Sequence, residues 1–311
     1  MSVPPEAIPQ SSAANFKQTI IRLKMRSGDE IKKLIVDIAK SDNRIKAVLL
    51  NGSRTNSKVL TDKYQDFDIV YIVNDLESFV SDHRWTNILG DKIIWQLPDE
   101  MTFEEDDKDE EPIDFHYLML FKDGNRIDLT LCPIKKIQAG FQADSLTVVW
   151  LDKDNIFSNI SEPNDFDYLI KKPTENFFLD TCNEFWWVST YVSKGLCRNE
   201  ITYAKEMLET VVRPIFMKII EWHIGAETHF SVSFGKSGKF MTQYLSSTQY
   251  DKILSTYSDY QIENNWKSLF DMTELFGQFA RAVAEKLYFQ YNFNEEQNVT
   301  MYLKQSYYEQ K

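Results

Sequence analysis

Three segments of the chain carry residues that could do chemistry on phosphates. Gly52 and Ser53 follow a short apolar run, at a point that predicts a sharp turn. Asp66 and Asp68 open a second apolar run, and Asp128 lies inside a third, between two apolar neighbours. Each feature alone is common in proteins where it is only a turn or a strand edge. The ordered combination of all three is what indicates a functional site.

The spacing of Asp66 and Asp68 predicts a cation site. Alternate residues of a strand point to the same face, so the two carboxylates would lie side by side. Neighbouring carboxylates repel each other unless a cation lies between them. Asp128 would be costly to bury without a partner, so we expect it to join the same cluster. Such oxygen ligands suit Mg²⁺, which completes its shell with water and phosphate oxygens.

The Gly52-Ser53 turn would supply the phosphate-binding part of this site. Glycine lets the backbone turn tightly and approach a phosphate, because it has no side chain in the way. The Ser53 hydroxyl and the neighbouring N–H groups can donate hydrogen bonds to phosphate oxygens. Turn and carboxylates together predict a two-metal phosphoryl or nucleotidyl transferase, with Asp66, Asp68 and Asp128 as its catalytic and metal-binding residues.

The elements that must position these residues are short strands of one domain. A capping box, Ser27 to Glu30, predicts the start of a helix that ends near Asn43. Strands are predicted at 45–50, 67–73 and 93–95, and a hairpin at 115–121 and 126–131.

The second half of the sequence is helical. After about residue 155 the pattern predicts helices at 176–195, 200–223, 239–256 and 264–291. We therefore expect an α+β fold: a polar, flexible leader at 1–24, a domain at 25–155 with a mixed β-sheet and flanking helices, and a helical domain at 165–311. The acidic run at 104–111 is interpreted as a solvated loop, or alternatively as a segment that attracts cations.

Composition and charge exclude several classes of protein. The 311 residues include 35 basic and 47 acidic ones, a net charge of −12, which argues against a nucleic-acid partner and favours a cationic small molecule. No apolar run reaches the roughly 20 residues of a membrane-spanning helix, and the N-terminus lacks the features of a secretory signal. Three widely spaced cysteines indicate neither a disulfide framework nor a zinc site. We expect a soluble, cytoplasmic protein that does not bind membranes.

The motifs resemble the DNA-polymerase-β-like nucleotidyltransferase superfamily, whose signature is Gly-Ser, then Asp-x-Asp, then a third carboxylate. The segments 50–56, 64–70, 123–131 and 182–192 are also similar to the aminoglycoside 6-adenylyltransferases, the streptomycin-modifying enzymes. This similarity runs from about Met25 to about residue 290, across both expected domains. The leader lies outside it, and the acidic run is unusually charged for the family.

The resemblance implies a reaction and roles for the site. The family transfers AMP from ATP to the 6-hydroxyl of streptomycin and releases pyrophosphate, with two Mg²⁺ ions. Asp66 and Asp68 would hold Mg²⁺ against the ATP phosphates. Asp128 would contact the second metal and accept the proton of the hydroxyl. The residues that would cradle the β- and γ-phosphates are Gly52, Ser53 and Arg54.

The helix predicted at 176–195 offers a site for the acceptor. Asp180, Glu184, Trp187 and Tyr191 follow one another at helical spacing and form a single stripe. Carboxylates can pair with guanidinium groups and aromatic rings make cation–π contacts, so the stripe suits a guanidinium-bearing acceptor. The alternative is that the aromatic residues are core and the carboxylates are solvated. Lys194, one turn further, would reach the triphosphate or is simply an exposed lysine.

Several alternatives remain open at this point. The acceptor could be another aminoglycoside or a lincosamide, because the carboxylates do not determine it. A glycosyltransferase could use Asp-x-Asp but would need neither the Gly-Ser turn nor Asp128, and the net charge disfavours a template-dependent polymerase or a tRNA nucleotidyltransferase. A non-catalytic nucleotidyltransferase-like binding module would usually have lost a carboxylate, whereas all three are present. A monomer and a homodimer are both compatible with the sequence.

Overall fold

The computed structural model describes residues 24–102, 114–140, 142–158 and 160–310. The predictions made for the leader at 1–24, except at Lys24, and for the acidic run at 104–111 lie outside the described residues. The chain forms two compact units, with the boundary between Asp165 and Phe166. Each unit has its own hydrophobic core.

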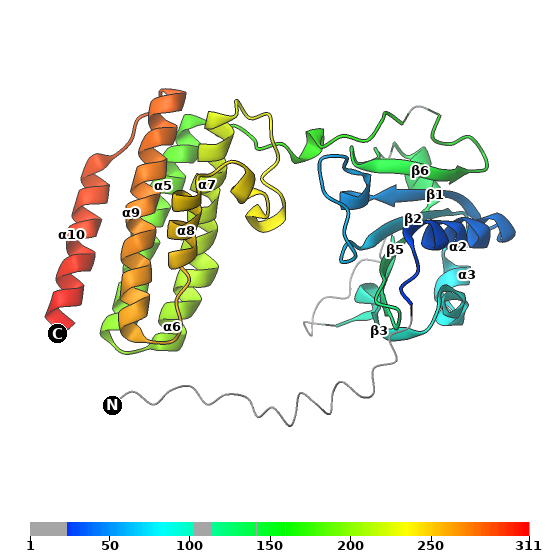
Figure 1. The fold of residues 1–311 in the computed structure, drawn as a ribbon, viewed down its shortest axis with the longest axis horizontal. Coiled ribbons are helices and arrows are strands. Elements are labelled where there is room, and N and C mark those ends of the chain that lie inside the picture. Colours follow the sequence, from blue (N-terminus) through cyan, green and yellow to red (C-terminus); the bar gives the residue numbers. More distant parts are fainter. Residues whose placement is uncertain (1–23, 103–113, 141, 159, 311) are drawn as a thin grey trace. The chain divides into compact units, whose positions relative to one another are not determined.

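The first unit is built on a six-stranded mixed sheet (Figure 1). The strands are β1 (Ile45–Asn51), β2 (Phe67–Val73), β3 (Lys92–Gln96), β4 (Phe115–Phe121), β5 (Arg126–Pro133) and β6 (Thr147–Asp152). Their order is β3-β4-β5-β2-β1-β6, with β2 and β5 parallel and the other neighbours antiparallel. The helical segments are α2 (Gly28–Ser41), η1 (Gly52–Thr55), α3 (Glu77–Val80), η2 (His83–Leu89), η3 (Pro98–Glu100) and α4 (Ile134–Gln138). The expected α+β fold is confirmed.

Helix α2 covers one face of this sheet and forms the main core with it. Ser27 caps the helix through the predicted capping box with Glu30, and Ile31 and Ile35 are fully buried. Tyr71 of β2 donates a hydrogen bond from its hydroxyl to the carbonyl oxygen of Ile35, at 2.8 Å. Because side chains alternate along a strand, the polar residues of β2 and β5 are left on the opposite face. We call this opposite face, which carries Asp68 and Asp128, the carboxylate face.

The second unit consists of packed helices. They are α5 (Glu175–Cys197), α6 (Ile201–Glu206), a π-helical segment η5 (Met207–Val212), α7 (Arg213–Glu227), α8 (Ser247–Ser255), α9 (Ile262–Leu287) and α10 (Phe293–Gln310), with the short 3₁₀ segments η4 (Phe166–Tyr168), η6 (Lys236–Gly238) and η7 (Met241–Gln243). Helices α5, α7 and α9 enclose a core rich in aromatic residues (Figure 1), where the rings of Phe185 and Phe276 stack at 3.6 Å. The helical C-terminal region is as expected.

Three elements differ from the sequence-based expectation. The helix predicted from residue 239 begins only at Ser247, because Ser246 and Gln249 form a capping box there. Helix α10 was not predicted, since Leu303 is its one buried residue among those described and its apolar pattern is weak. Strand β6 was also missed.

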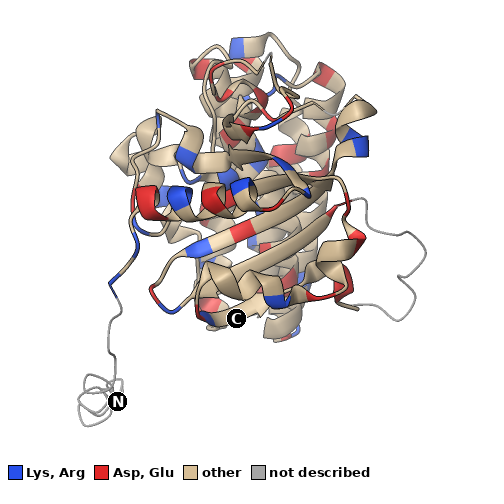
Figure 2. Ribbon diagram, turned by 90° about the vertical axis from the view of Figure 1, so that its right-hand side faces the viewer, with Lys and Arg blue, Asp and Glu red and all other residues tan. Residues whose placement is uncertain are grey.

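Charged residues of both signs are distributed over the surface. Figure 2 shows acidic and basic residues interspersed in this view rather than gathered into one wholly basic surface. Within the described residues, every helix is too short or too polar to span a lipid bilayer.

Candidate active site

The parallel pairing of β2 with β5 brings two of the predicted carboxylates together. Asp68 and Asp128 are direct register partners, so their side chains project from the same face of the sheet. Asp66 lies just before β2, and its side chain is 37% exposed, against 21% for Asp128. The three carboxylates, predicted from two separate stretches of sequence, thus lie at one place, half-buried and accessible from solvent.

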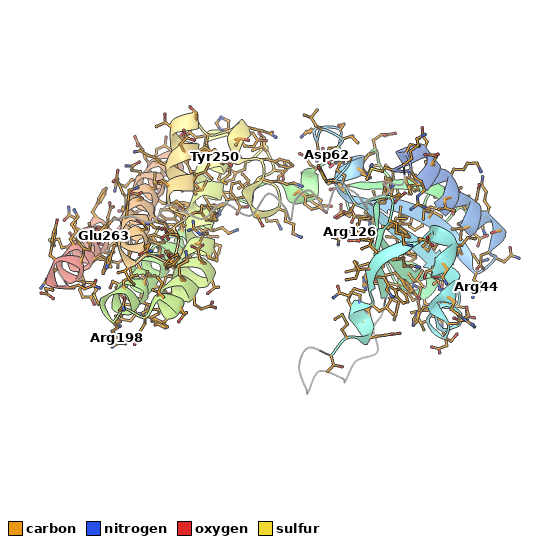
Figure 3. All side chains as sticks on the ribbon, turned by 60° about the horizontal axis from the view of Figure 1, so that its bottom comes forward. Arg44, Asp62, Arg126, Arg198, Tyr250 and Glu263 are labelled. Atoms are coloured by element: carbon orange, nitrogen blue, oxygen red, sulfur yellow. The ribbon has the colours of Figure 1, made fainter. Side chains whose placement is uncertain are left out.

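A basic residue that the sequence analysis did not single out lies among these carboxylates. Arg126 (labelled in Figure 3) donates from Nε and Nη2 to the two carboxylate oxygens of Asp128, each at 2.7 Å. Its Nε also lies 3.6 Å from a carboxylate oxygen of Asp66. Arg126 and Asp128 are two residues apart on one strand, which places both on the same face. That spacing was the signal available in the sequence.

The environment of Asp68 disfavours its ionised form. Burial raises the pKa of this carboxyl from 3.8 to about 6, and the charges of Asp128 and Asp66 add to the effect. Arg126 and Arg54 act in the opposite direction and offset only part of it. A cation bound beside Asp68 would remove the repulsion, so the site favours a positively charged ligand.

Gly52 is required by the close approach of the Asp68 side chain. Its φ is +76°, and its N–H donates to the carbonyl oxygen of Leu146 at 3.0 Å. A Cβ at this position would lie 2.3 Å from Oδ2 of Asp68. The turn and the carboxylate therefore fit each other only while residue 52 has no side chain.

The neighbours of Gly52 fix the segment that leads into β2. Arg54 donates from Nε to the carbonyl oxygen of Asp66 at 2.9 Å and from Nη2 to that of Gln65 at 2.7 Å, with its guanidinium 3.7 Å from the ring centre of Phe67. Gln65 in turn donates to Oγ of Ser53 at 3.3 Å. In this structure Arg54 therefore positions Asp66, and two of its nitrogens are engaged with the backbone.

In the second unit, part of the predicted stripe lines a pocket on α5. Asp180 and Glu184 are exposed and line a hollow of about 400 Å³, together with Phe177, Thr181, Pro214, Ile215 and Lys218. Trp187 is 61% exposed and donates from its indole nitrogen to the hydroxyl of Tyr191 at 2.7 Å. The alternative in which the aromatic residues are core therefore does not hold for Trp187, whereas Tyr191 is half-buried and packs against the core of this unit.

Lys194 continues this surface by one helical turn. It is exposed, and its Nζ lies 5.3 Å from the ring centre of Tyr191. The ring of Tyr191 therefore already has one cation beside it on the same helix.

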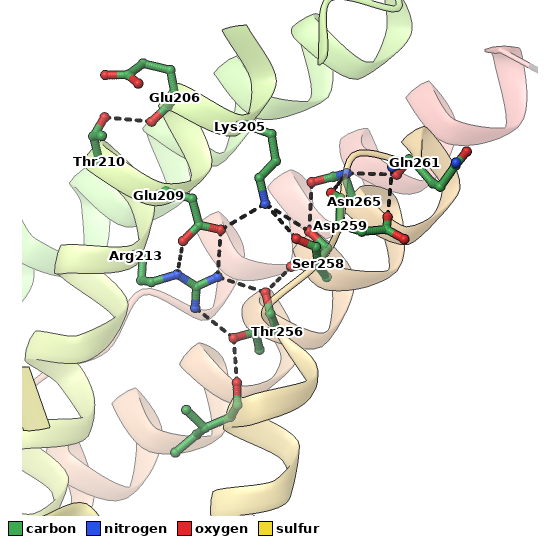
Figure 4. Close-up of polar contacts among 12 residues, drawn as sticks. Lys205, Glu206, Glu209, Thr210, Arg213, Thr256, Ser258, Asp259, Gln261 and Asn265 are labelled. Atoms are coloured by element: carbon green, nitrogen blue, oxygen red, sulfur yellow. Dashed lines mark hydrogen bonds and ion pairs between the residues drawn. The ribbon is translucent and has the colours of Figure 1, made fainter. Parts of the chain in front are cut away.

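A polar network fixes the start of α7, which supplies three residues of the pocket on α5. Arg213 is buried and forms an ion pair with Glu209 of the π-helical segment (Figure 4). It also donates to Thr256, at 2.8 Å to both the hydroxyl and the carbonyl oxygen, while Lys205 donates to the carbonyl oxygen of Ser258 at 2.9 Å. These contacts join the π-helical segment and the start of α7 to the residues that follow α8.

Comparison with known proteins places this geometry in a family. The family model described as Streptomycin adenylyltransferase matches residues 25–306. The chain belongs to this family. An aminoglycoside 6-adenylyltransferase of Bacillus subtilis (strain 168) is 43% identical over 268 residues, which cover 86% of this chain and 93% of the relative. One from Campylobacter jejuni is 41% identical over 273 residues, or 88% and 93% of the two chains. A crystal structure of an aminoglycoside 6-adenyltransferase from Bacillus subtilis matches with 39% identity and a TM-score of 0.45, covering 91% of this chain and 99% of that one.

The residues of this member of the streptomycin adenylyltransferase family fit a divalent metal. The donors are carboxylate oxygens, which Mg²⁺ prefers, and the repulsion around Asp68 is what a cation would relieve. Among the described residues, no three Asp, Glu, His or Cys side chains already form a group that could hold a metal ion. Asp128 is instead paired with Arg126, so a metal shared by Asp66, Asp68 and Asp128 requires that ion pair to loosen.

The contact between Gly52 and Asp68 leads to a first prediction. Gly52→Ala should lower the turnover of the enzyme by about a hundredfold, because the new Cβ displaces the Asp68 carboxylate by a distance of the order that misaligns reacting groups. Gly140→Ala is the matched control: Gly140 also has a positive φ, +101°, but a Cβ there meets no atom within 4 Å. Both variants should lose about 1 kcal/mol of stability from backbone strain. Equal activity of the two variants in a steady-state assay would contradict the prediction.

Proposed function

We propose that this protein transfers AMP from ATP to the hydroxyl at the 6-position of streptomycin, releasing pyrophosphate and inactivating the antibiotic. The observation that carries this proposal is the meeting of Asp66, Asp68 and Asp128 beside the Gly52 turn on the carboxylate face. Membership of the family supports the reaction type. We propose the cytoplasm as its compartment, where ATP is available.

The carboxylates would hold two Mg²⁺ ions, which neutralise phosphate charge and favour attack at the α-phosphorus. Asp66 and Asp68 would bind the nucleotide-associated metal, and Asp128 would share the second. The Asp128 carboxylate would then accept the proton of the acceptor hydroxyl as a general base. Arg126 donates to both oxygens of Asp128 and so orients this carboxylate.

The turn that follows β1 would bind the β- and γ-phosphates. Gly52 leaves room for them, and the Ser53 hydroxyl can donate a hydrogen bond. Arg54 would contribute positive charge while it holds the backbone of Gln65 and Asp66. Lys194 is proposed as a further cation for the triphosphate.

The acceptor would bind to the stripe of α5. Asp180 and Glu184 supply negative charge beside Phe177, and Trp187 and Tyr191 supply aromatic faces. A cationic aminoglycoside matches both features, because guanidinium groups pair with carboxylates and lie over rings.

A direct assay tests the proposed function. Purified protein with ATP and MgCl₂ should release pyrophosphate only when streptomycin is present, and mass spectrometry should show streptomycin heavier by one AMP group. Release of pyrophosphate with another aminoglycoside or a lincosamide, but not with streptomycin, would show that the acceptor is different and that the proposed reaction type is correct. If no pyrophosphate is released with any of these acceptors, the alternative of a non-catalytic binding module would be favoured.

The acceptor stripe gives a second prediction. Glu184→Ala should raise the streptomycin KM at least about tenfold, since an unpaired charge in a binding cleft costs roughly 2–5 kcal/mol and 1.4 kcal/mol is a factor of ten. The KM for ATP should change little. The control is Asn183→Ala, on the same helix and exposed, but outside the residues that line the pocket.

Salt provides an independent check of the same contact. Raised ionic strength should weaken streptomycin binding by the wild type more than by Glu184→Ala, because salt screens exposed charge pairs. Equal increases of both KM values, or none, would remove the stripe from the acceptor site.

A further inference from the structure

The first unit has a hollow that the proposed roles leave unused. It measures about 700 Å³ and is lined by Ile94, Gln96, Leu118, Leu120, Arg126 and their neighbours. We infer that this pocket, which we call the β3–β4 pocket, receives the ring of the acceptor that bears the reacting hydroxyl. The inference rests on the proposed function, because it takes Asp128 as the base.

Strand register places the β3–β4 pocket directly beside the proposed base. Leu118 of β4 is the antiparallel partner of Asp128, and Leu120 is the partner of Arg126. Directly opposite residues of an antiparallel pair project from the same face with their Cβ atoms about 5 Å apart. Ile94 of β3 is paired with Leu120 and continues the surface outward. The pocket therefore begins one strand away from the Asp128 carboxylate, on the carboxylate face.

The direction of the reaction favours the acceptor over the nucleotide as its occupant. In an in-line displacement the attacking oxygen and the departing pyrophosphate lie on opposite sides of the phosphorus. The turn proposed to hold the phosphates follows β1, and the strands run β1, β2, β5, β4, β3 from there. Asp68 and Asp128 thus lie between the phosphate turn and the pocket. The pyrophosphate leaves on the β1 side, so the attacking molecule enters from the β4 side.

The walls of the pocket fit the ring of a small molecule. Ile94, Leu118 and Leu120 supply apolar walls on the carboxylate face. The Glu100 carboxylate, 48% exposed, lies at the same pocket and accepts from Nε2 of His83 at 2.9 Å. Apolar walls with a few polar groups, and a volume in the range of about 300–1,000 Å³, are typical of small-molecule sites.

Filling the pocket tests the inference. Leu120→Trp should raise the KM for streptomycin at least about tenfold and leave the KM for ATP within about twofold, because it removes space only on the acceptor side. Calorimetric titration of the full-length variant with streptomycin, without ATP, should show the same loss of affinity. The matched control is Ile93→Trp, on the neighbouring strand β3, exposed, and not among the residues that line the pocket.

Each outcome decides between the possible occupants. A raised KM for ATP with an unchanged KM for streptomycin would overturn the inference and make the pocket a nucleotide site. Unchanged values for both substrates would also overturn it. If the wild-type protein adenylylates no acceptor, the proposed function fails first, and streptomycin titration still reports on the pocket.

A second variant covers the case in which Leu120→Trp does not fold. Gln96→Trp narrows the same pocket from the exposed edge strand, where a larger side chain meets solvent rather than core. It should reproduce the rise in streptomycin KM and the loss of affinity. Wild-type values in a folded Gln96→Trp protein would overturn the inference.

Discussion

Replacing Asp68 by Asn is expected to abolish adenylyl transfer and leave the fold intact. The negative charges of Asp66 and Asp128 both act on Asp68. The ionised form of Asp68 is the proposed ligand of the metal that is bound to ATP. An amide keeps the shape but loses the negative charge that Mg²⁺ requires. The measurement is pyrophosphate release at saturating Mg²⁺, ATP and streptomycin, where transfer at a measurable rate would refute the assignment.

The same variant should be slightly more stable than the wild type. In the folded protein the pKa of Asp68 is about 6, above its ordinary 3.8, so the ionised carboxylate disfavours the fold. This penalty is fully present above pH 6 and disappears as the pH falls towards 4. We expect a gain of about 1 kcal/mol at neutral pH, discounted because the group is partly solvated, and no gain near pH 4. Denaturant titrations at the two pH values measure it.

Asp91→Asn is the control for both effects. Asp91 lies in the same unit, with a side chain that is 76% exposed and forms an ion pair with Lys122 at 3.3 Å. An exposed pair contributes roughly 0–1 kcal/mol, so this variant should keep full activity and nearly wild-type stability. A loss of activity in both variants would indicate a general effect of charge on the unit.

Local patterns were enough to predict the elements that carry the site. Strand β2 coincides with the predicted segment 67–73, since alternating β-branched and aromatic residues have no good helical alternative. The capping box at Ser27 and the turn at Gly52 were also readable, because both depend on residues close in sequence. These features fix where the carboxylates lie along the chain.

The arrangement in space needed the structure, because it depends on long-range pairing. Nothing local specifies that Asp68 faces Asp128 in a parallel register, which pairs residues sixty positions apart in sequence. Arg126 was overlooked for the same reason: an arginine next to a strand aspartate is common, and only the sheet shows that it also approaches Asp66. Helix α10 escaped prediction because its packing leaves most of its surface in solvent.

Replacing Asp128 by Asn is expected to separate binding from chemistry. The variant should lose about three or more orders of magnitude in turnover, since a general base contributes about 10²–10⁴-fold and Asp128 would also share a metal. Affinity for Mg·ATP should stay within about tenfold, because Asp66, Asp68 and the Gly52 turn still hold the nucleotide. A titration with a non-reactive ATP analogue in the presence of Mg²⁺ measures that affinity.

A variant of Arg126 tests separately how the orientation of Asp128 contributes to turnover. In the wild type it donates to both oxygens of Asp128, whereas an asparagine offers it a single neutral acceptor. Arg126→Gln is therefore the matched variant: it should disturb the orientation of Asp128 but keep the carboxylate, and lose less turnover than Asp128→Asn. Complete loss of Mg·ATP affinity in a folded Asp128→Asn protein would show that this carboxylate is required to bind the nucleotide. The proton of the acceptor hydroxyl would then have to be taken by another group.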